Sequence, residues 1–429
     1  MQGKGTTKGP SPSVVLPHFI FGALSFFIVT LLLVLSPEIF SGHYFQPKLL
    51  TITHISILGW GVMIIFGSIY QLLPVLLETP LYSEALAKIT FLALATGILL
   101  IAYSFWNFYV GIQLEIASGF LLTSFILFSI NIFTTVRRSK KNSNESDFIS
   151  TAVIWLLFTG SLGLLMACNF THPFLTKSHL LFLKIHAHMG IAGWFILLIM
   201  GVASKLIPMF LLSQNLNQKK LTAAYYFVNA GLIGFIVDQF FFEGSIISPL
   251  FALLIISGVL CFISFTFEAY KKRVRKILDI GLKHSFTAIL VLFLPLILGG
   301  ILSFIHSPDS PFLLRIYLIY GTSIFLGFIS SLILGQSFKT LPFIVWLHKH
   351  GNNAGGGKAP LPKDFYSEKL AQAQFVIYLV ALTTLLTGIL FAIPTVIRIG
   401  SILLLVTAML YNLNIFKIIF INAKSSKLI

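Results

Sequence analysis

The chain has 429 residues, of which 57% are hydrophobic and 10% are charged, with a mean hydropathy of +0.94 and a formal net charge of +16. A surface this apolar would aggregate in water, so the composition excludes an ordinary soluble protein and indicates a mainly lipid solvent. The basic residues lie between apolar segments and not on one soluble face, so the charge indicates orientation in a membrane and no binding of nucleic acid.

About 20 consecutive apolar residues are needed to cross the hydrocarbon core of a bilayer. The sequence predicts twelve such spans, and therefore an all-α integral membrane protein with one polytopic domain over residues 1–429. We interpret the first span as a retained helix, because the apolar run after Lys4 and Lys8 has no clear cleavage site. The predicted spans are 16–36, 49–75, 85–105, 110–136, 149–170, 181–211, 221–242, 247–270, 284–305, 312–345, 371–394 and 396–421.

The basic residues are distributed unequally between the two sides of these spans. The loops after even-numbered spans, together with Lys88 and both termini, carry 21 Lys and Arg residues, whereas the opposite side carries five. We call the first of these the basic side. The positive-inside rule predicts that the basic side is cytoplasmic and that both termini lie there. The expected location is the inner (plasma) membrane of a bacterium, as a multi-pass protein with the lipid bilayer as its surroundings.

Spans 2, 6 and 10 share one spaced pattern. Each has an anchor, a glycine followed by an aromatic residue at +5, a second glycine at +13, Gln or Lys at +17 and proline at +20. The anchors are His54, His188 and Thr322, and both intervals equal 134 residues (188 − 54 and 322 − 188). This indicates an internal threefold repeat of four-span units at 16–136, 149–270 and 284–421. The paired glycines would permit close helix approach or leave room for a planar group.

Histidines at matching repeat positions are the candidate site. Intramembrane histidines are costly and usually face a cavity, a partner or a metal. His186 lies two residues before His188, about 200° around a helix, so both cannot reach one metal from a regular helix. Their placement near the outer face suits axial ligation of haem and equally suits copper. The candidate cofactor-binding and metal-binding residues are therefore His54, His188 and His186.

The remaining motifs carry less chemistry. Lys205 and Lys339, at the +17 position, are expected to extend to the lipid headgroups. The segment GNNAGGGKAPLPKD after His350 lacks the spacing of a phosphate-binding loop and is interpreted as a linker. Cys168 and Cys261 form no CxxC pair, and no HExxH motif indicates hydrolytic chemistry.

The motifs THISILGWG and HAHMGIAGW, on spans 2 and 6 of twelve, make the chain resemble subunit I of the haem–copper oxidases. The resemblance implies a low-spin haem held by spans 2 and 10, a high-spin haem held by span 10, and a copper held by spans 6 and 7. It implies that His54 is the low-spin haem ligand and that His186 or His188 is a copper ligand. It further implies a b-type haem and, as partner, a cytochrome c or another respiratory subunit.

The chain departs from this family at two spans. Neither span 7 nor span 10 contains a histidine, and the third anchor is Thr322. A complete oxygen-reducing centre therefore cannot be built here in the family's way. The chain is more similar to the NnrS-type branch, which comprises membrane haem and copper proteins linked to nitric oxide stress.

We therefore expect a haem-binding membrane protein, with copper as a second candidate cofactor and a role in electron transfer or in the chemistry of a gas such as NO or O2. Any enzyme activity would be that of an oxidoreductase related to cytochrome oxidase. A second axial ligand to a haem on His54 would come from His188 or His306; otherwise the iron would be five-coordinate and open to a gas. The alternatives are a non-redox transporter, an assembly factor for a respiratory complex, or a terminal oxidase completed by a partner's ligands.

Overall fold

The computed structural model describes residues 9–139, 143–305, 310–350 and 360–420. Within these ranges the regular elements are helices, and twelve spans are long and apolar enough to cross a membrane. The twelve predicted spans are confirmed, and their limits differ from the observed ones by at most five residues. The spans formed by a single helix are α1 (Pro12–Leu35), α4 (Glu84–Asn107), α5 (Ile112–Arg138), α6 (Asn144–Thr171), α9 (Lys219–Phe242), α10 (Ser248–Lys271), α11 (Ile280–Leu302), α14 (Glu368–Phe391) and α15 (Pro394–Phe420).

Three spans contain a π-helical segment between two α-helices. A π-helix is rare, and such segments are frequent at functional sites. Each segment begins at the residue directly after a sequence anchor, and the starts are separated by 134 residues (189 − 55 and 323 − 189). These spans are α2 (Pro47–His54), η2 (Ile55–Val62) and α3 (Met63–Leu77); α7 (His179–His188), η3 (Met189–Ile196) and α8 (Leu197–Leu211); and α12 (Pro311–Thr322), η4 (Ser323–Ile329) and α13 (Ser330–His350).

The contacts divide the chain into two compact units. Unit 1 comprises the described residues up to 91, residues 279–292 and those from 310 onward, and unit 2 comprises residues 92–278 and 293–305. The first and third anchors belong to unit 1, and the second belongs to unit 2. The single polytopic domain stays a prediction.

The helix starts follow from the local sequence. Ser178 precedes α7, and its hydroxyl accepts a hydrogen bond from the Leu181 amide at 3.2 Å. Ser310 does the same for Leu313 at 3.1 Å before α12, where Pro311 occupies the first helical position. A serine cap satisfies an amide that has no helical partner, and proline has no amide proton to leave unsatisfied there. The two caps fix where α7 and α12 begin, and so how far along each helix its anchor lies.

The paired glycines bring the first and second spans of each repeat together. A Cβ added at Gly67 would lie 2.7 Å from the Cβ of His18, and one added at Gly59 would lie 2.7 Å from the Ser25 hydroxyl. The glycine faces are therefore filled by a neighbouring helix, which favours close helix approach over room for a planar group. The corresponding contacts are Gly193 with Trp155, Gly201 with Phe148, Gly327 with Val291 and Gly335 with His284.

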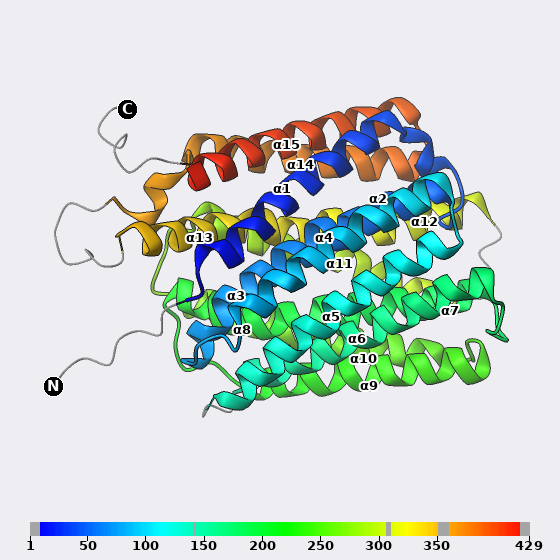
Figure 1. Ribbon diagram of the computed structural model, residues 1–429, viewed down its shortest axis with the longest axis horizontal. Coiled ribbons are helices and arrows are strands. Elements are labelled where there is room, and N and C mark those ends of the chain that lie inside the picture. Colours follow the sequence, from blue (N-terminus) through cyan, green and yellow to red (C-terminus); the bar gives the residue numbers. More distant parts are fainter. Residues whose placement is uncertain (1–8, 140–142, 306–309, 351–359, 421–429) are drawn as a thin grey trace. The chain divides into compact units, whose positions relative to one another are not determined.

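The core of unit 1 contains stacked aromatic rings. Phe26 of α1 stacks on Trp60 at 4.6 Å between ring centroids, and Tyr411 of α15 meets Trp60 edge-on at 5.2 Å. The indole nitrogen of Trp60 donates to the Ser330 hydroxyl at 3.0 Å, so the polar end of this buried ring is satisfied. Along these contacts α15 packs beside α1 and α14 (Figure 1).

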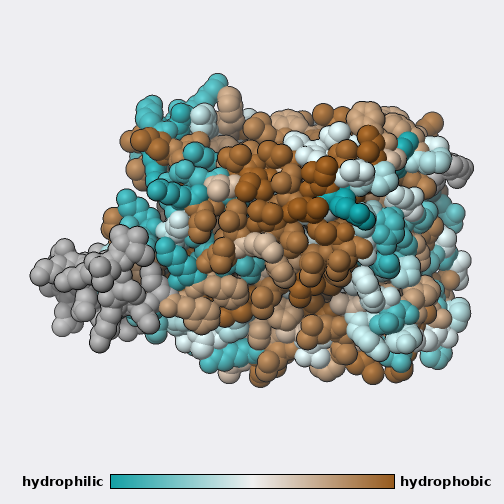
Figure 2. All heavy atoms as spheres, turned by 90° about the horizontal axis from the view of Figure 1, so that it is seen from above, coloured by the Kyte–Doolittle hydropathy of each residue, from teal (hydrophilic) through white to brown (hydrophobic). Residues whose placement is uncertain are grey.

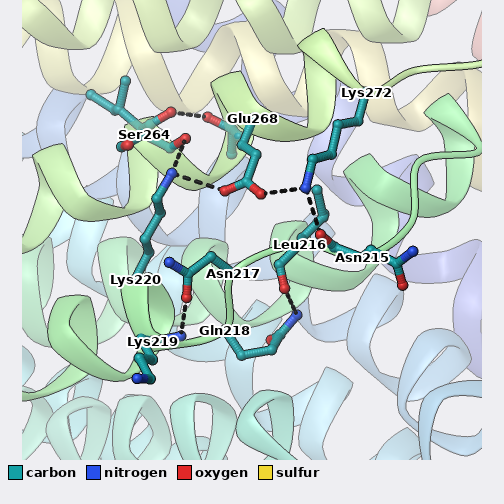
Figure 3. Close-up of polar contacts among 11 residues, drawn as sticks. Asn215, Leu216, Asn217, Gln218, Lys219, Lys220, Ser264, Glu268 and Lys272 are labelled. Atoms are coloured by element: carbon teal, nitrogen blue, oxygen red, sulfur yellow. Dashed lines mark hydrogen bonds and ion pairs between the residues drawn. The ribbon is translucent and has the colours of Figure 1, made fainter.

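In unit 2, Glu268 joins two connections on the basic side (Figure 3). Its carboxylate accepts from Lys220 at the start of α9 and from Lys272 just after α10, both at 2.9 Å. Lys272 also donates to the Asn215 carbonyl at 2.6 Å. The α8–α9 connection is therefore tied to the end of α10.

Lys339 does not extend to the headgroups as predicted. Its ammonium forms an ion pair with Asp279 at 2.7 Å, and its side chain is only 11% exposed. Asp279 also accepts a hydrogen bond from the Leu282 amide at 3.1 Å and so caps α11. The expectation for Lys339 was wrong because its partner lies 60 residues away in the sequence. Lys205, at the same offset in the second pattern, is exposed.

The surface agrees with a membrane environment. Figure 2 shows a face on which hydrophobic residues gather in the middle and hydrophilic residues toward both ends. A band of apolar side chains bounded by polar ones is what a bilayer requires of the residues that face lipid. The protein is therefore a multi-pass membrane protein.

Candidate functional site

His54 ends α2 directly before the first π-helical segment and is half-buried. Its Nδ1 lies 2.8 Å from the carbonyl oxygen of Leu50, one turn earlier. A carbonyl can only accept, so Nδ1 carries the proton, and in the neutral ring the lone pair is on Nε2. Metal-ligating histidines usually donate their other ring N–H in this way. The ring is thus held in the tautomer that ligation through Nε2 requires.

His188 repeats this arrangement in unit 2. Its Nδ1 lies 2.8 Å from the carbonyl oxygen of Lys184, and the residue ends α7 directly before η3. The imidazole packs against Phe235 of α9, with ring centroids 4.7 Å apart. Both anchor histidines therefore have the same hydrogen bond, the same tautomer and the same place relative to a π-helical segment.

His186 and His188 lie against different helices. A Cβ added at Gly163 of α6 would be 3.0 Å from Cε1 of His186, whereas His188 packs on Phe235 of α9. The two rings therefore leave α7 in different directions, in line with their separation of about 200° along a helix.

Lys184, one turn before His188 on α7, was not predicted to have a role at this site. The Lys184 ammonium donates to the Gln239 side chain at 3.0 Å and lies 5.7 Å from the Phe235 ring centroid. Asp238, the residue before Gln239, is buried. Its carboxylate accepts hydrogen bonds from the backbone amide of Ser245 at 3.1 Å and from the Ser248 hydroxyl.

Asp238 therefore closes the turn between α9 and α10, while Lys184 ties α7 to α9. The spacing of four residues between Lys184 and His188 is the signal in the sequence that could have indicated that these two side chains are neighbours.

Thr322 stands at the third anchor and precedes η4 as the histidines precede η2 and η3. In this π-helical segment the hydroxyl of Tyr378 donates to the carbonyl oxygens of Leu326 and Gly327, at 2.6 and 2.7 Å. The third repeat pattern thus keeps the π-helical segment although its anchor is Thr322 and not a histidine. His306, the other candidate for a second ligand, lies outside the described residues.

Two further histidines, His18 and His284, are fully buried. Nδ1 of His18 lies 2.8 Å from the Val14 carbonyl oxygen, and Nδ1 of His284 lies 3.3 Å from the Ser331 hydroxyl. Neither was among the candidate site residues predicted from the sequence. The glycine at +13 of the pattern marks a close helix contact, but its spacing does not show that His18 and His284, each on another helix, face it.

Among the described residues, no three His, Cys, Asp or Glu side chains lie together as a metal-binding group. A copper ion would need several such ligands, whereas a porphyrin supplies four nitrogens and needs only an axial imidazole. Single imidazoles such as those of His54 and His188 therefore fit what a haem requires of the protein. No family model matches the chain, and no curated protein matches it.

Proposed function

We propose that the protein is a haem-binding membrane protein of the haem–copper oxidase fold, with a role in electron transfer or in the chemistry of NO or O2. The observation that carries the proposal is the shared hydrogen bond of His54 and His188 to the carbonyl one turn earlier. A bound haem would supply a redox-active iron that can also bind a diatomic gas.

In this proposal His54 is the principal axial ligand and His188 is the second candidate, with His186 next. The Leu50 carbonyl holds the His54 ring in orientation and increases the basicity of Nε2 by accepting the Nδ1 proton. A b-type haem is expected because Cys168 and Cys261 lie on different helices and neither belongs to a CxxCH motif.

The repeat also belongs to the proposal. Three π-helical segments at intervals of 134 residues, each directly after an anchor and each containing the first glycine of a pair, support three four-span units. We infer that both termini lie on the cytoplasmic side of a bacterial plasma membrane, on the basis of the basic loops. A cytochrome c or another respiratory subunit would be the electron-exchange partner.

Oxygen reduction by the family's centre is not part of the proposal. α9 contains no histidine, and the tenth span contains none between Pro311 and Leu347. These are the spans that would supply copper ligands and the ligand of a second haem in the resembled family. A respiratory oxidase activity is therefore not expected.

The test is a purified sample expressed with ample haem, measured by reduced-minus-oxidised spectroscopy, haem extraction and copper analysis. We expect a Soret band, an extractable b-type haem and no oxygen consumption at respiratory rates. A sample without haem, from cells that load a control cytochrome normally, would contradict the proposal. Copper at one ion per chain without haem would indicate a copper protein in its place.

A further inference from the structure

Each of the three repeats contains the same contact between its first and third spans. A ring of the first span packs edge-on against a ring of the third span, beside the +13 glycine of the second. The residue before the third-span ring is fully buried in all three cases. The ring pairs are His18 with Phe91 (5.0 Å), Phe148 with Tyr225 (5.2 Å) and His284 with Phe375 (4.7 Å), and the preceding residues are Thr90, Ala224 and Gln374.

The three contacts differ sharply in polarity. In unit 2, Phe148 and Ala224 make this position apolar. The corresponding position of the third repeat, in unit 1, has His284 and Gln374, each fully buried. Burying two polar side chains where the fold accepts Phe and Ala is unfavourable unless their hydrogen bonds are satisfied.

Three polar atoms at this position have no hydrogen-bond partner among the described residues: Nε2 of His284, and Nε2 and Oε1 of Gln374. The Ser331 hydroxyl donates to the His284 carbonyl at 3.0 Å, so it accepts from Nδ1 of the same residue. Nε2 of His284 therefore needs a donor, and the Gln374 amide needs one donor and one acceptor. Leaving a buried polar group without a partner is unfavourable, because its hydrogen bonds to water are lost and not replaced.

His284 and Gln374 lie on two helices that contact each other at this position. The His284 ring contacts Phe375 and Tyr378 of α14, with centroid distances of 4.7 and 5.7 Å. Gln374 lies directly before Phe375 and one turn before Tyr378, so it shares the helix face of Tyr378. A small molecule that both donates and accepts hydrogen bonds would satisfy both side chains.

The basic side of unit 1 is close to this position. His284 follows Asp279, the cap of α11, by five residues, about 7.5 Å along the helix axis. One residue beyond His284, the Ser285 hydroxyl accepts a hydrogen bond from the Gln336 side chain at 2.7 Å, and Oε1 of Gln336 has no partner among the described residues. Polar side chains thus lie both at the start of α11, at Asp279, and directly beside His284, at Ser285 and Gln336.

We propose that water occupies a hydrated polar pocket at His284 and Gln374, and enters it from the basic side of unit 1. The matched position at Phe148 and Ala224 of unit 2 is dry. The pocket gives a buried imidazole access to solvent protons within the membrane-spanning region. This inference does not depend on haem binding.

The first experiment uses the unaltered protein in lipid nanodiscs. X-ray hydroxyl-radical footprinting generates radicals from water in place, so it oxidises side chains next to internal water, and mass spectrometry locates the oxidation. Phe375 and Tyr225 are both half-buried and match each other in the contact, so they form the comparison. We expect at least a fivefold faster oxidation of Phe375 than of Tyr225. Equal rates would overturn the proposal.

The second experiment replaces the polar pair by the pair that the chain carries in unit 2. The double variant His284→Phe, Gln374→Ala should fold, because Phe148 and Ala224 pack in the same contact, and the oxidation of Phe375 should fall to the rate of Tyr225. In a background with Cys168→Ser and Cys261→Ala, Gln374→Cys should react with N-ethylmaleimide at least fivefold faster than Ala224→Cys. A double variant that retains fast oxidation, or equal cysteine reactivities, would refute a water site at these residues.

Discussion

Replacing Gly335 by Ala tests the close contact between α11 and α13. The added Cβ would lie 2.9 Å from the carbonyl oxygen of Gly281 and against the Cβ of His284, and neither atom belongs to the end of a flexible side chain. Overpacking costs about 1–3 kcal/mol, and rigid neighbours place this case near the upper end. The better helix propensity of Ala returns about 1 kcal/mol. We therefore expect Gly335→Ala to lower the free energy of unfolding by about 2 kcal/mol.

Gly321→Ala is the matched control in the same span, because no heavy atom of the described residues lies within 4 Å of a Cβ built there. This variant should gain up to about 1 kcal/mol from propensity alone. The assay is unfolding by sodium dodecyl sulfate in mixed micelles, followed by far-ultraviolet circular dichroism, with both variants and the unaltered protein compared. If Gly335→Ala unfolds at the same detergent fraction as Gly321→Ala, the close approach of these two helices is refuted.

Three further predictions concern two ion pairs and one tyrosine, and the first of them is measured by the same detergent unfolding. Lys339→Met should lower the free energy of unfolding by about 1–2 kcal/mol, because it leaves Asp279 without its cation; this value lies between those of exposed and buried ion pairs. Its control, Lys205→Met, replaces an exposed lysine and should change the free energy of unfolding by no more than about 0.5 kcal/mol. The hydrogen bond from Lys48 lowers the pKa of Glu38, so this pair stabilises the fold above the ordinary glutamate pKa and ceases to do so as the pH falls through the lowered value. Both side chains are about half exposed, so the effect is small, and Glu38→Gln should flatten the acid limb of thermal midpoints measured from pH 7 to pH 3. Burial raises the pKa of Tyr366 to about 12, so its phenol should stay neutral at pH 11, where Tyr366→Phe should show the same tyrosinate absorbance as the unaltered protein.

The twelve spans could be predicted because hydropathy is a local property of the sequence. The limits of each span were less certain, since caps such as Ser143 extend a helix beyond its apolar run. The direction of His186 relative to His188 followed from helix geometry alone, but the helices they face did not.

The contacts between distant segments could not be predicted from periodicity. Lys339 meets Asp279 across 60 residues, and Trp60 meets Ser330 across 270. The π-helical segments were also missed, since a regular helix was assumed after each anchor. In η4 the carbonyl oxygens of Leu326 and Gly327 accept from Tyr378 on another helix, and no local sequence pattern encodes such a partner.

The central claim is that His54 holds a haem through Nε2. The direct measurement is the haem content and reduced-minus-oxidised spectrum of His54→Ala beside His172→Ala, purified identically. His172 is an exposed histidine near the end of α6 whose ring lies 3.0 Å from the Thr171 hydroxyl and makes no bond to a carbonyl one turn earlier. We predict that His54→Ala loses the haem or shifts its Soret band, while His172→Ala matches the unaltered protein. An unchanged spectrum and full haem content in His54→Ala would contradict the claim.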